Sequence, residues 1–534
     1  MTHENKWLRL LPFGLLFLLS LSYFFLFVRV LWRIGDEGIL VYGAQLVAQG
    51  ALPSRDFFEV MGPASFYWLG FFFKLFGINI AVVRAVLILT SALTIVLLYW
   101  LTLRIYNGPF AILPSVFFMI SGVPLWPVAN HHWDSNFFGL LAAGTFFLWQ
   151  DYSRKWLLAV AGVLAGITSC FIQQKGLYLI LAMAFLAWYC GNRTGQAKLK
   201  IVTEEAVLLT GYAGVGCLVL LFFYFSGGLY ELIYANVIWP ISNYSNINVV
   251  PYGFGLMKFY YANFIENFQL ILPYPIYHVV SILNLTPLLI IFFMPILLFG
   301  FTGLACCQQA TRVMIYNSAK GLSYLVLGFA LWISELHRKD MIHLIYGSPL
   351  LLILLFVTWS YCFSKKKFLQ SIGINFIIMC IILFGSYNAF IATSANQKIV
   401  SRRGVLYGFK EDNALKYLIE KTNPGDYAFV YPYYPMYYFL ADLKNPTRYT
   451  LLIGHFNTEI QFNEVIENLK KQHVKYVLWD TLVSGENLKK WFPAYENTSK
   501  GNLHLEKYIE DSYETVYMEN GIKILRRFED RLSN

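Results

Sequence analysis

Four carboxylates gather in a short polar stretch near the start of an otherwise very apolar chain. They are Asp36, Glu37, Asp56 and Glu59, and they follow the apolar run 10–32. A positioned carboxylate can act as a general base that takes a proton from a hydroxyl group. A structural explanation also exists, because an aspartate such as Asp36 can cap a helix and an acid such as Glu37 is favoured in its first turn.

A second polar stretch, NHHWDSNFFG, contains residue types that bind metal ions. It includes His131, His132 and Asp134, although it lacks the i, i+4 histidine pair of a helix-borne zinc site. The candidate ligands of a divalent metal ion are Asp36, His132 and Asp134. In the structural alternative, Asp134 caps the next helix and the histidines lie at the membrane interface.

Cations in two further stretches are candidates for binding a phosphate group. Lys175 ends an apolar run in CFIQQKGLYL, where snorkelling to the membrane interface is the alternative. Arg338 lies in SELHRKDMIHLIYGSPLLL, and its planar fork matches phosphate oxygens and keeps its charge. His337 and His343 would support it, and His343 falls inside the next apolar run, where a polar group is unfavourable unless it is used. An ordinary polar turn between two spans would explain the same pattern.

The composition is that of a polytopic membrane protein. Hydrophobic residues make up 57% of the 534 residues, charged residues only 13%, and the mean hydropathy is +0.52. The net charge is +10, but residues 393–534 contain 19 basic and 18 acidic residues, so the excess belongs to the preceding part. Such an excess is typical of cytoplasmic loops, and nucleic acid is not an expected partner. The spacing of the seven cysteines indicates no disulfide framework and no metal motif.

Eleven apolar runs are long enough to predict membrane spans, within a range of ten to thirteen. They cover residues 10–32, 78–103, 109–126, 136–150, 156–172, 177–190, 206–226, 279–301, 319–334, 341–363 and 369–392. With a cytoplasmic N-terminus, the inner segments contain 13 basic and four acidic residues, whereas the outer segments contain nine of each. This asymmetry predicts that the N-terminus is cytoplasmic. Arg84, inside the second run, is expected to snorkel to the interface.

Two domains are expected. Residues 1–392 form a transmembrane domain with outer loops 33–77 and 227–278, and residues 393–534 form a small extracytoplasmic α/β domain. In the second domain, YAFVYP and VKYVLWD predict buried strands and NEVIENLKKQ predicts an amphipathic helix. The stretch YETVYMENGIKILRR predicts a hairpin around Asn520-Gly521.

The first outer loop resembles that of the GT-C membrane glycosyltransferases. The resemblance is carried by DEGILVYGAQLVAQGALPSRDFFEVMGPASFYWLGFFFKLFG, and VRAVLILTSALTIVLLYWLTLRIYN is similar to the second span of that family. The pattern is closest to the branch of protein O-mannosyltransferases and bacterial aminoarabinose transferases. The similarity is good over residues 30–110 and diffuse to about residue 390. At Val60-Met61-Gly62-Pro63 the chain departs from members that have Lys-Pro-Pro, so a phosphate-binding lysine is missing there.

The resemblance implies an inverting glycosyltransferase that moves a hexosyl or pentosyl group from a polyprenyl-phosphate donor to an acceptor hydroxyl at the outer face. Because a phosphate leaving group is stable as an anion, one carboxylate base and cationic phosphate binders suffice. Asp36 is the expected base. The expected substrate contacts are Glu37, Asp56, Glu59, Asp134, Lys175, His337, Arg338 and His343. No cofactor is required by these motifs, and a divalent metal ion is the candidate cofactor.

A transporter or flippase of lipid-linked sugars is the alternative function. A transporter would have ionisable residues near the middle of its spans and broken helices in two repeated halves. In this chain, the charges of the predicted membrane part collect at one face of the membrane. A non-catalytic scaffold with a sensing domain would leave the acidic loops unexplained. The expected partners are a polyprenyl-phosphate-linked sugar, a lipid, glycan or protein acceptor, and membrane lipids. The expected location is the cell envelope, in a bacterial inner membrane with the active site on the periplasmic or extracellular side; an endoplasmic-reticulum enzyme would have the same orientation relative to the cytosol.

Overall fold

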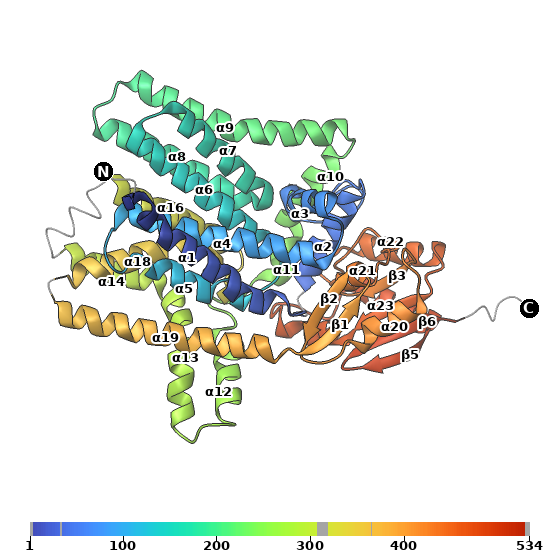
Figure 1. Cartoon of the computed structure of the whole chain (residues 1–534). Coiled ribbons are helices and arrows are strands. Elements are labelled where there is room, and N and C mark those ends of the chain that lie inside the picture. Colours follow the sequence, from blue (N-terminus) through green and yellow to red (C-terminus); the bar gives the residue numbers. More distant parts are fainter. Residues whose placement is uncertain (1–3, 33–34, 307–318, 365, 529–534) are drawn as a thin grey trace, which may run out of the picture.

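The computed structural model describes residues 4–32, 35–306, 319–364 and 366–528. A bundle of helices lies beside a small C-terminal sheet domain (Figure 1). Each predicted apolar run falls on helical segments within the described residues. The hydrophobic pattern of the sequence therefore located the helices correctly.

Within the described residues, four helices are long and apolar enough to cross a membrane by length and composition. They are α1 (Glu4–Val28), with its apolar part from Leu10, α4 (Ile80–Ile105), α9 (Lys198–Phe225) and α19 (Lys367–Ser394). Two bent pairs bring the number to six if each pair is one span. These pairs are α13 (Ile276–Phe292) with α14 (Met294–Cys306), bent by 74°, and α17 (Met341–Gly347) with α18 (Pro349–Cys362), bent by 71°.

The remaining helices of the bundle are shorter or more polar. They are α5 (Leu113–Ser121), η1 (Val123–Leu125), α6 (His131–Tyr152), α7 (Lys155–Phe171), α8 (Gln173–Arg193) and α16 (Ala319–Glu335). Because a straight span needs about 20 apolar residues, length alone does not establish α5, α7 and α16 as spans. The number of eleven spans stays a prediction.

Both predicted outer loops fold into helices, most of which lie at the end of the bundle that faces the sheet domain, whereas the last helix of the second loop projects from the bundle beside α13 (Figure 1). The first contains α2 (Gly35–Ala48) and α3 (Pro63–Phe76). The second contains α10 (Leu229–Ile233), η2 (Tyr234–Ile238), η3 (Pro240–Tyr244), α11 (Ser245–Asn248), η4 (Leu256–Tyr261) and α12 (Ala262–Phe268). The helix α2 ends before Gly50, whose φ of 102° stops it as predicted. It begins at Gly35, so Asp36 lies in its first turn instead of capping it.

The C-terminal residues form a hairpin and a four-stranded sheet. The hairpin pairs β1 (Gln397–Ser401) with β2 (Gly404–Gly408), and the sheet has the order β3-β4-β6-β5. Its strands are β3 (Ala428–Tyr431), β4 (Tyr476–Asp480), β5 (Tyr513–Glu519) and β6 (Ile522–Arg527). The pair β3–β4 is parallel and the other two pairs are antiparallel. Both predicted strands and the hairpin at Asn520-Gly521 are confirmed.

Helices cover both faces of this sheet. They are α20 (Asn413–Lys421), α21 (Met436–Leu440), α22 (Glu459–Lys471) and α23 (Lys500–Ser512), with η5 (Thr481–Val483) and η6 (Gly485–Lys490) between them. Because side chains alternate along a strand, Phe429 packs with α22 and α23, whereas Val430 packs with α20 and α21. The second of these cores continues into α2 and α3. The polar first loop and the sheet domain therefore share one hydrophobic core.

Candidate active site

Asp36 meets the sheet domain at the first turn of α2. The hydroxyl of Tyr433, in the loop before α21, donates a hydrogen bond to Oδ1 of Asp36. Desolvation raises the pKa of Tyr433 well above its usual value, and the charge of Asp36 adds to this effect. Tyr433 was missed by sequence reasoning, because it is 397 residues away from Asp36 and the stretch around it, YPYYP, carries no specific chemical signal.

Glu37 is almost completely buried, at 1% exposure. Arg84 of α4 binds it through both terminal nitrogens, with Nη2 at 3.0 Å from Oε2, and the backbone N–H of Ala129 lies 3.0 Å from Oε1. The snorkelling prediction for Arg84 was wrong, since its charge is satisfied inside the protein. These contacts give Glu37 a structural role in joining α2, α4 and the start of α6, and its predicted substrate contact stays a prediction.

Glu59 is buried close to Asp36. The hydroxyl of Thr450, from the sheet domain, donates a hydrogen bond to Oε1 of Glu59. Desolvation raises the pKa of Glu59 to about 8; the Thr450 bond opposes the shift and the charge of Asp36 adds to it. Near neutral pH this carboxyl is therefore largely protonated, and it can donate a hydrogen bond as well as accept one.

Asp56 lies away from these groups, at the surface. Arg55 holds it from Nε and Nη2 at 2.8 and 2.9 Å, and the backbone N–H of Leu52 lies 2.7 Å from Oδ2. The Arg55 hydrogen bonds hold the pKa of Asp56 below its usual value. Arg55 also donates to the carbonyl of Ser226 at 2.6 Å, so Asp56 organises the contact with the end of α9.

Arg338 ties the end of α16 to the sheet domain. Its Nε donates to Asp340 at 2.7 Å, Nη1 to Oδ1 of Asn248 at 2.7 Å, and Nη2 to the carbonyl of Trp491 at 2.8 Å. A guanidinium has five N–H donors. After these three bonds, one N–H remains on each terminal nitrogen.

The charges of Asp36 and Arg338 affect the pKa of the same two tyrosines, Tyr244 and Tyr433. Desolvation raises the pKa of Tyr244, and the charge of Arg338 lowers it while that of Asp36 raises it. The same two charges act on Tyr433, again with opposite signs. The predicted base contacts the sheet domain through Tyr433 and the predicted phosphate binder contacts it through Trp491, so both lie at the junction of the bundle and the sheet domain.

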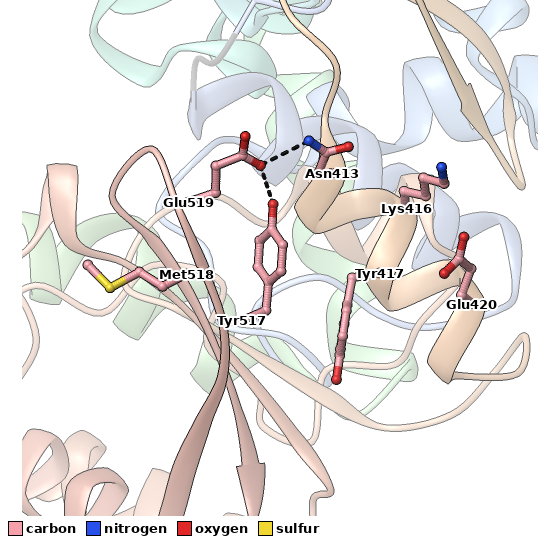
Figure 2. A pocket seen from close by; sticks show the side chains of 7 residues that line it. All are labelled: Asn413, Lys416, Tyr417, Glu420, Tyr517, Met518 and Glu519. Atoms are coloured by element: carbon pink, nitrogen blue, oxygen red, sulfur yellow. Dashed lines mark hydrogen bonds between the residues drawn. The ribbon is translucent and has the colours of Figure 1, made fainter.

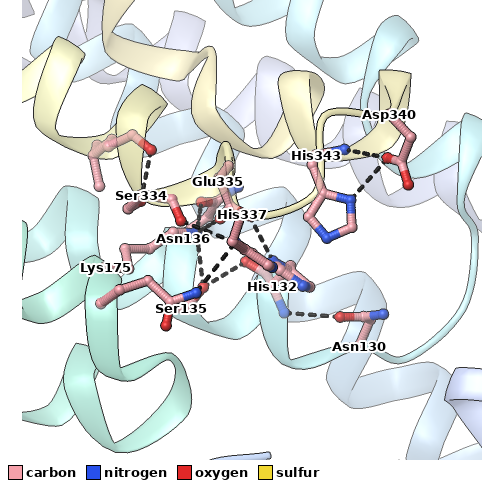
Figure 3. A network of polar contacts seen from close by, with 12 residues as sticks. Asn130, His132, Ser135, Asn136, Lys175, Ser334, Glu335, His337, Asp340 and His343 are labelled. Carbon is pink, nitrogen blue, oxygen red and sulfur yellow. Dashed lines mark hydrogen bonds and ion pairs between the residues drawn. The ribbon is translucent and has the colours of Figure 1, made fainter. Parts of the chain in front are cut away.

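Lys175 belongs to a buried polar network at the ends of α6, α8 and α16 (Figure 3). Its Nζ donates to Oγ of Ser135 at 2.9 Å and to Oδ1 of Asn136 at 2.7 Å, and it forms an ion pair with Glu335. Lys175 and Glu335 both have 0% exposure, so the snorkelling alternative for Lys175 was wrong. Because an ammonium group has three donors, these contacts use all of them, and binding of phosphate by Lys175 stays a prediction.

Three histidines meet beside this network. The ring centroids of His132 and His343 are 4.9 Å apart, those of His337 and His343 are 5.0 Å apart, and those of His132 and His337 are 6.2 Å apart. Within the described part of the chain, these three are a group whose ligand atoms lie within 4.8 Å of one another. The sequence singled out all three residues but placed only His132 in its candidate metal set.

Asp134, the third predicted metal ligand, takes a different position. The cap of α6 is Asn130, whose side chain accepts the N–H of His132 at 2.9 Å, so the capping alternative for Asp134 was wrong. Asp134 lines a small cavity of about 10 Å³ together with Trp68, a volume close to that of one water probe. The structure thus groups His132 with His337 and His343, and not with Asp36 and Asp134.

A shallow surface hollow lies elsewhere, on the sheet domain (Figure 2). It has a volume of about 380 Å³ and is lined by residues of α20 and β5, including Lys416 and Tyr417. In it, Oε2 of Glu519 accepts hydrogen bonds from Tyr517 and, at 3.0 Å, from Asn413. None of the predicted site residues lines this hollow.

No protein-family profile and no curated protein matches the sequence. Solved structures do match. ArnT from Cupriavidus metallidurans bound to undecaprenyl phosphate is 12% identical, with a TM-score of 0.55 over 98% of this chain and 98% of that chain. The Archaeoglobus fulgidus oligosaccharyltransferase in complex with Zn and sulfate is 15% identical, with a TM-score of 0.54 over 96% of this chain and 73% of that chain.

A third match is the same archaeal enzyme, AglB, in complex with an inhibitory peptide and a dolichol-phosphate. It is 13% identical, with a TM-score of 0.53 over 100% of this chain and 76% of that chain. At these identities the likeness concerns the fold, and it includes the bundle and the C-terminal domain together. The chain has the fold of the GT-C membrane glycosyltransferases, which confirms the resemblance found in its first outer loop.

Proposed function

We propose that this chain is an inverting GT-C glycosyltransferase that moves a hexosyl or pentosyl group from a polyprenyl-phosphate donor to an acceptor hydroxyl at the outer face of a membrane. The observation that carries the proposal is the hydrogen bond from Tyr433 of the sheet domain to the carboxylate of Asp36, in a region where the charge of Arg338 also acts on Tyr244 and Tyr433. The likeness to structures that contain undecaprenyl phosphate and dolichol-phosphate supports the choice of donor class.

In the proposed reaction, Asp36 takes the proton of the acceptor hydroxyl. The acceptor oxygen forms a bond to the anomeric carbon while the bond from that carbon to the phosphate oxygen breaks, which inverts the configuration. The polyprenyl phosphate leaves with the electron pair. The hydrogen bond from Tyr433 supports this role, because it engages Oδ1 of Asp36 with a hydroxyl and leaves Oδ2 for the acceptor.

Arg338 would stabilise the leaving phosphate. The two N–H groups that remain after its bonds to Asp340, Asn248 and Trp491 lie on different terminal nitrogens, as bidentate binding of phosphate requires. Because the guanidinium is held in place, little side-chain entropy is lost when phosphate binds. Negative charge developing on the phosphate oxygens would be stabilised by this fixed cation.

The proposed topology follows the charge of the loops. Residues 1–392 form the transmembrane domain with eleven spans and a cytoplasmic N-terminus, and residues 393–534 form the extracytoplasmic domain. The acceptor is a lipid, a glycan or a protein of the cell envelope, and the membrane is a bacterial inner membrane. Sugar transfer then takes place on the periplasmic or extracellular side, where α2 and the sheet domain meet.

Turnover by the purified full-length chain tests this function, with a panel of polyprenyl-phosphate sugars and with a chelator arm. Asp36→Asn is expected to lower the transfer rate by about 10²–10⁴-fold, the usual contribution of a general base, while donor binding is kept. The matched control is Asp511→Asn, since Asp511 is exposed on α23. Transfer by Asp36→Asn at the wild-type rate would refute the assignment. Movement of the donor across proteoliposome membranes without any transfer would favour the flippase.

A further inference from the structure

We propose that His132, His337 and His343 bind one transition-metal ion of the Zn²⁺ class, with an exchangeable fourth ligand. One ring nitrogen of each residue lies within 4.8 Å of those of the other two. Zinc binds imidazole nitrogens at about 2.0–2.1 Å in a tetrahedral arrangement, which places the ligand nitrogens about 3.4 Å apart. Movements of about 1 Å would therefore close the site. His337 is exposed and His343 partly exposed, so a small shift of the segment that carries them, with their Nδ1 contacts kept, would bring the three nitrogens together.

The other ring nitrogen of each histidine is already anchored (Figure 3). Nδ1 of His132 lies 2.9 Å from Oε2 of Glu335, and Nδ1 of His343 lies 2.8 Å from Oδ1 of Asp340. Nδ1 of His337 lies 3.1 Å from the carbonyl oxygen of Ser334. Histidines that bind metals almost always donate this second N–H to a carboxylate or a carbonyl, which fixes the tautomer and the ring orientation. His343 and His337 show this hydrogen bond, and Nδ1 of His132 makes an ion-pair contact with Glu335, so Nε2 of each ring is left for the ion.

The charges around the histidines favour an anionic fourth ligand. Two carboxylates, Glu335 and Asp340, are each paired with one cation, Lys175 and Arg338 respectively. Because these four charges sum to zero, the protein would not neutralise the charge of a bound dication. The ion would then attract an anion to its fourth position. Three protein ligands with an open fourth position are typical of zinc sites at which a ligand exchanges.

The ligand types also determine which ions bind. A set of imidazoles suits Zn²⁺, Co²⁺, Ni²⁺ or Cu²⁺, whereas Mg²⁺ and Ca²⁺ prefer oxygen ligands. An ion in this site would also fasten the start of α6, which carries His132, to the segment after α16, which carries His337 and Arg338. Binding is therefore expected to stabilise the folded chain.

The test uses the full-length chain in detergent, stripped with a chelator and titrated with Zn²⁺ or Co²⁺. Metal per chain, the visible spectrum of bound Co²⁺ and the unfolding temperature are measured. We expect about one ion per chain, tetrahedral Co²⁺ absorption and an upward shift of the unfolding temperature. His343→Gln and His337→Gln should bind at least about tenfold more weakly, and Asp340→Asn, through the orientation of His343, about 10–100-fold more weakly.

His504→Gln is the matched control, because His504 is exposed on α23, and it should bind like the wild type. Size-exclusion profiles show whether each variant is folded. The proposal is overturned if the stripped wild type takes up much less than one Zn²⁺, or if folded His337→Gln and His343→Gln both bind as tightly as the wild type. Effective competition by equimolar Mg²⁺ would also overturn it, because a carboxylate site would then be responsible. None of these readouts requires sugar transfer.

Discussion

The buried carboxyl group of Glu59 predicts how stability depends on pH. In the folded chain, desolvation raises its pKa to about 8 from an ordinary value of 4.5. Because the folded state holds this proton more tightly than the unfolded state, the contribution of Glu59 to stability is fully present below about pH 4.5. It is lost as the pH rises toward 8. At about 1.4 kcal/mol per pKa unit, the total loss is about 5 kcal/mol, of which about 3.5 kcal/mol falls between pH 5 and pH 8.

Glu59→Gln removes this loss, since glutamine is neutral and keeps an oxygen that can accept the Thr450 hydrogen bond. The variant and the wild type should unfold at similar temperatures near pH 5. Near pH 8 the variant should unfold roughly 3 °C higher, given the unfolding entropy of a chain of this length. Tryptophan fluorescence during heating in detergent measures the unfolding temperature of the variant and of the wild type at each pH. Glu467→Gln, at an exposed side chain, should follow the wild type at every pH. Parallel curves for Glu59→Gln and the wild type would refute the reasoning.

Two further predictions concern contacts of α2. Glu37→Gln leaves the guanidinium of Arg84 buried without its charge partner, so the free energy of unfolding should fall by about 3–5 kcal/mol; a change as small as that of Glu467→Gln, below about 1 kcal/mol, would contradict this. In Gly38→Ala, the new Cβ would lie 2.3 Å from the backbone nitrogen of the first residue of α21, so stability should fall by about 1–3 kcal/mol and sugar transfer should fall with it. The control Gly14→Ala meets no atom within 4 Å and should change neither the unfolding temperature nor the transfer rate.

The sequence predicted the elements of the fold well, because hydrophobic patterning acts locally. Apolar runs located the helices, and period-two patterns located β3, β4 and the hairpin of β5 and β6. The number of spans was harder to predict, since α13 and α17 are bent against the helices that follow them. Each break lies just before a proline, Pro295 or Pro349, which lacks the N–H for a helical hydrogen bond, and a count based on apolar composition does not take these breaks into account.

The sequence indicated which residues were candidates for the site, but it did not indicate which partners these residues contact. The roles of Asp36 and Arg338 stay predictions, although the charges of both act on the same tyrosines. Arg84 was interpreted as a snorkelling cation, and snorkelling was the alternative for Lys175, because a sequence shows the apolar run around a charge but not the distant acid that neutralises it. Tyr433 was missed for the same reason. In each case the partner lies far along the chain, and only the folded structure brings the two together.

The bond between Tyr433 and Asp36 has a consequence for biosynthesis. The two residues are separated by 397 positions, so at about 5–20 residues per second the ribosome adds Tyr433 about 20–80 s after Asp36. During that interval the first loop already carries its acids but lacks its tyrosine, and α2 lacks the sheet domain that completes its core. A nascent chain stalled between the end of α19 and Tyr433 would contain the helical bundle but would lack Tyr433 at the site. Because the sheet domain is synthesised last, the contact between Tyr433 and Asp36 can form only after the helical bundle has been made.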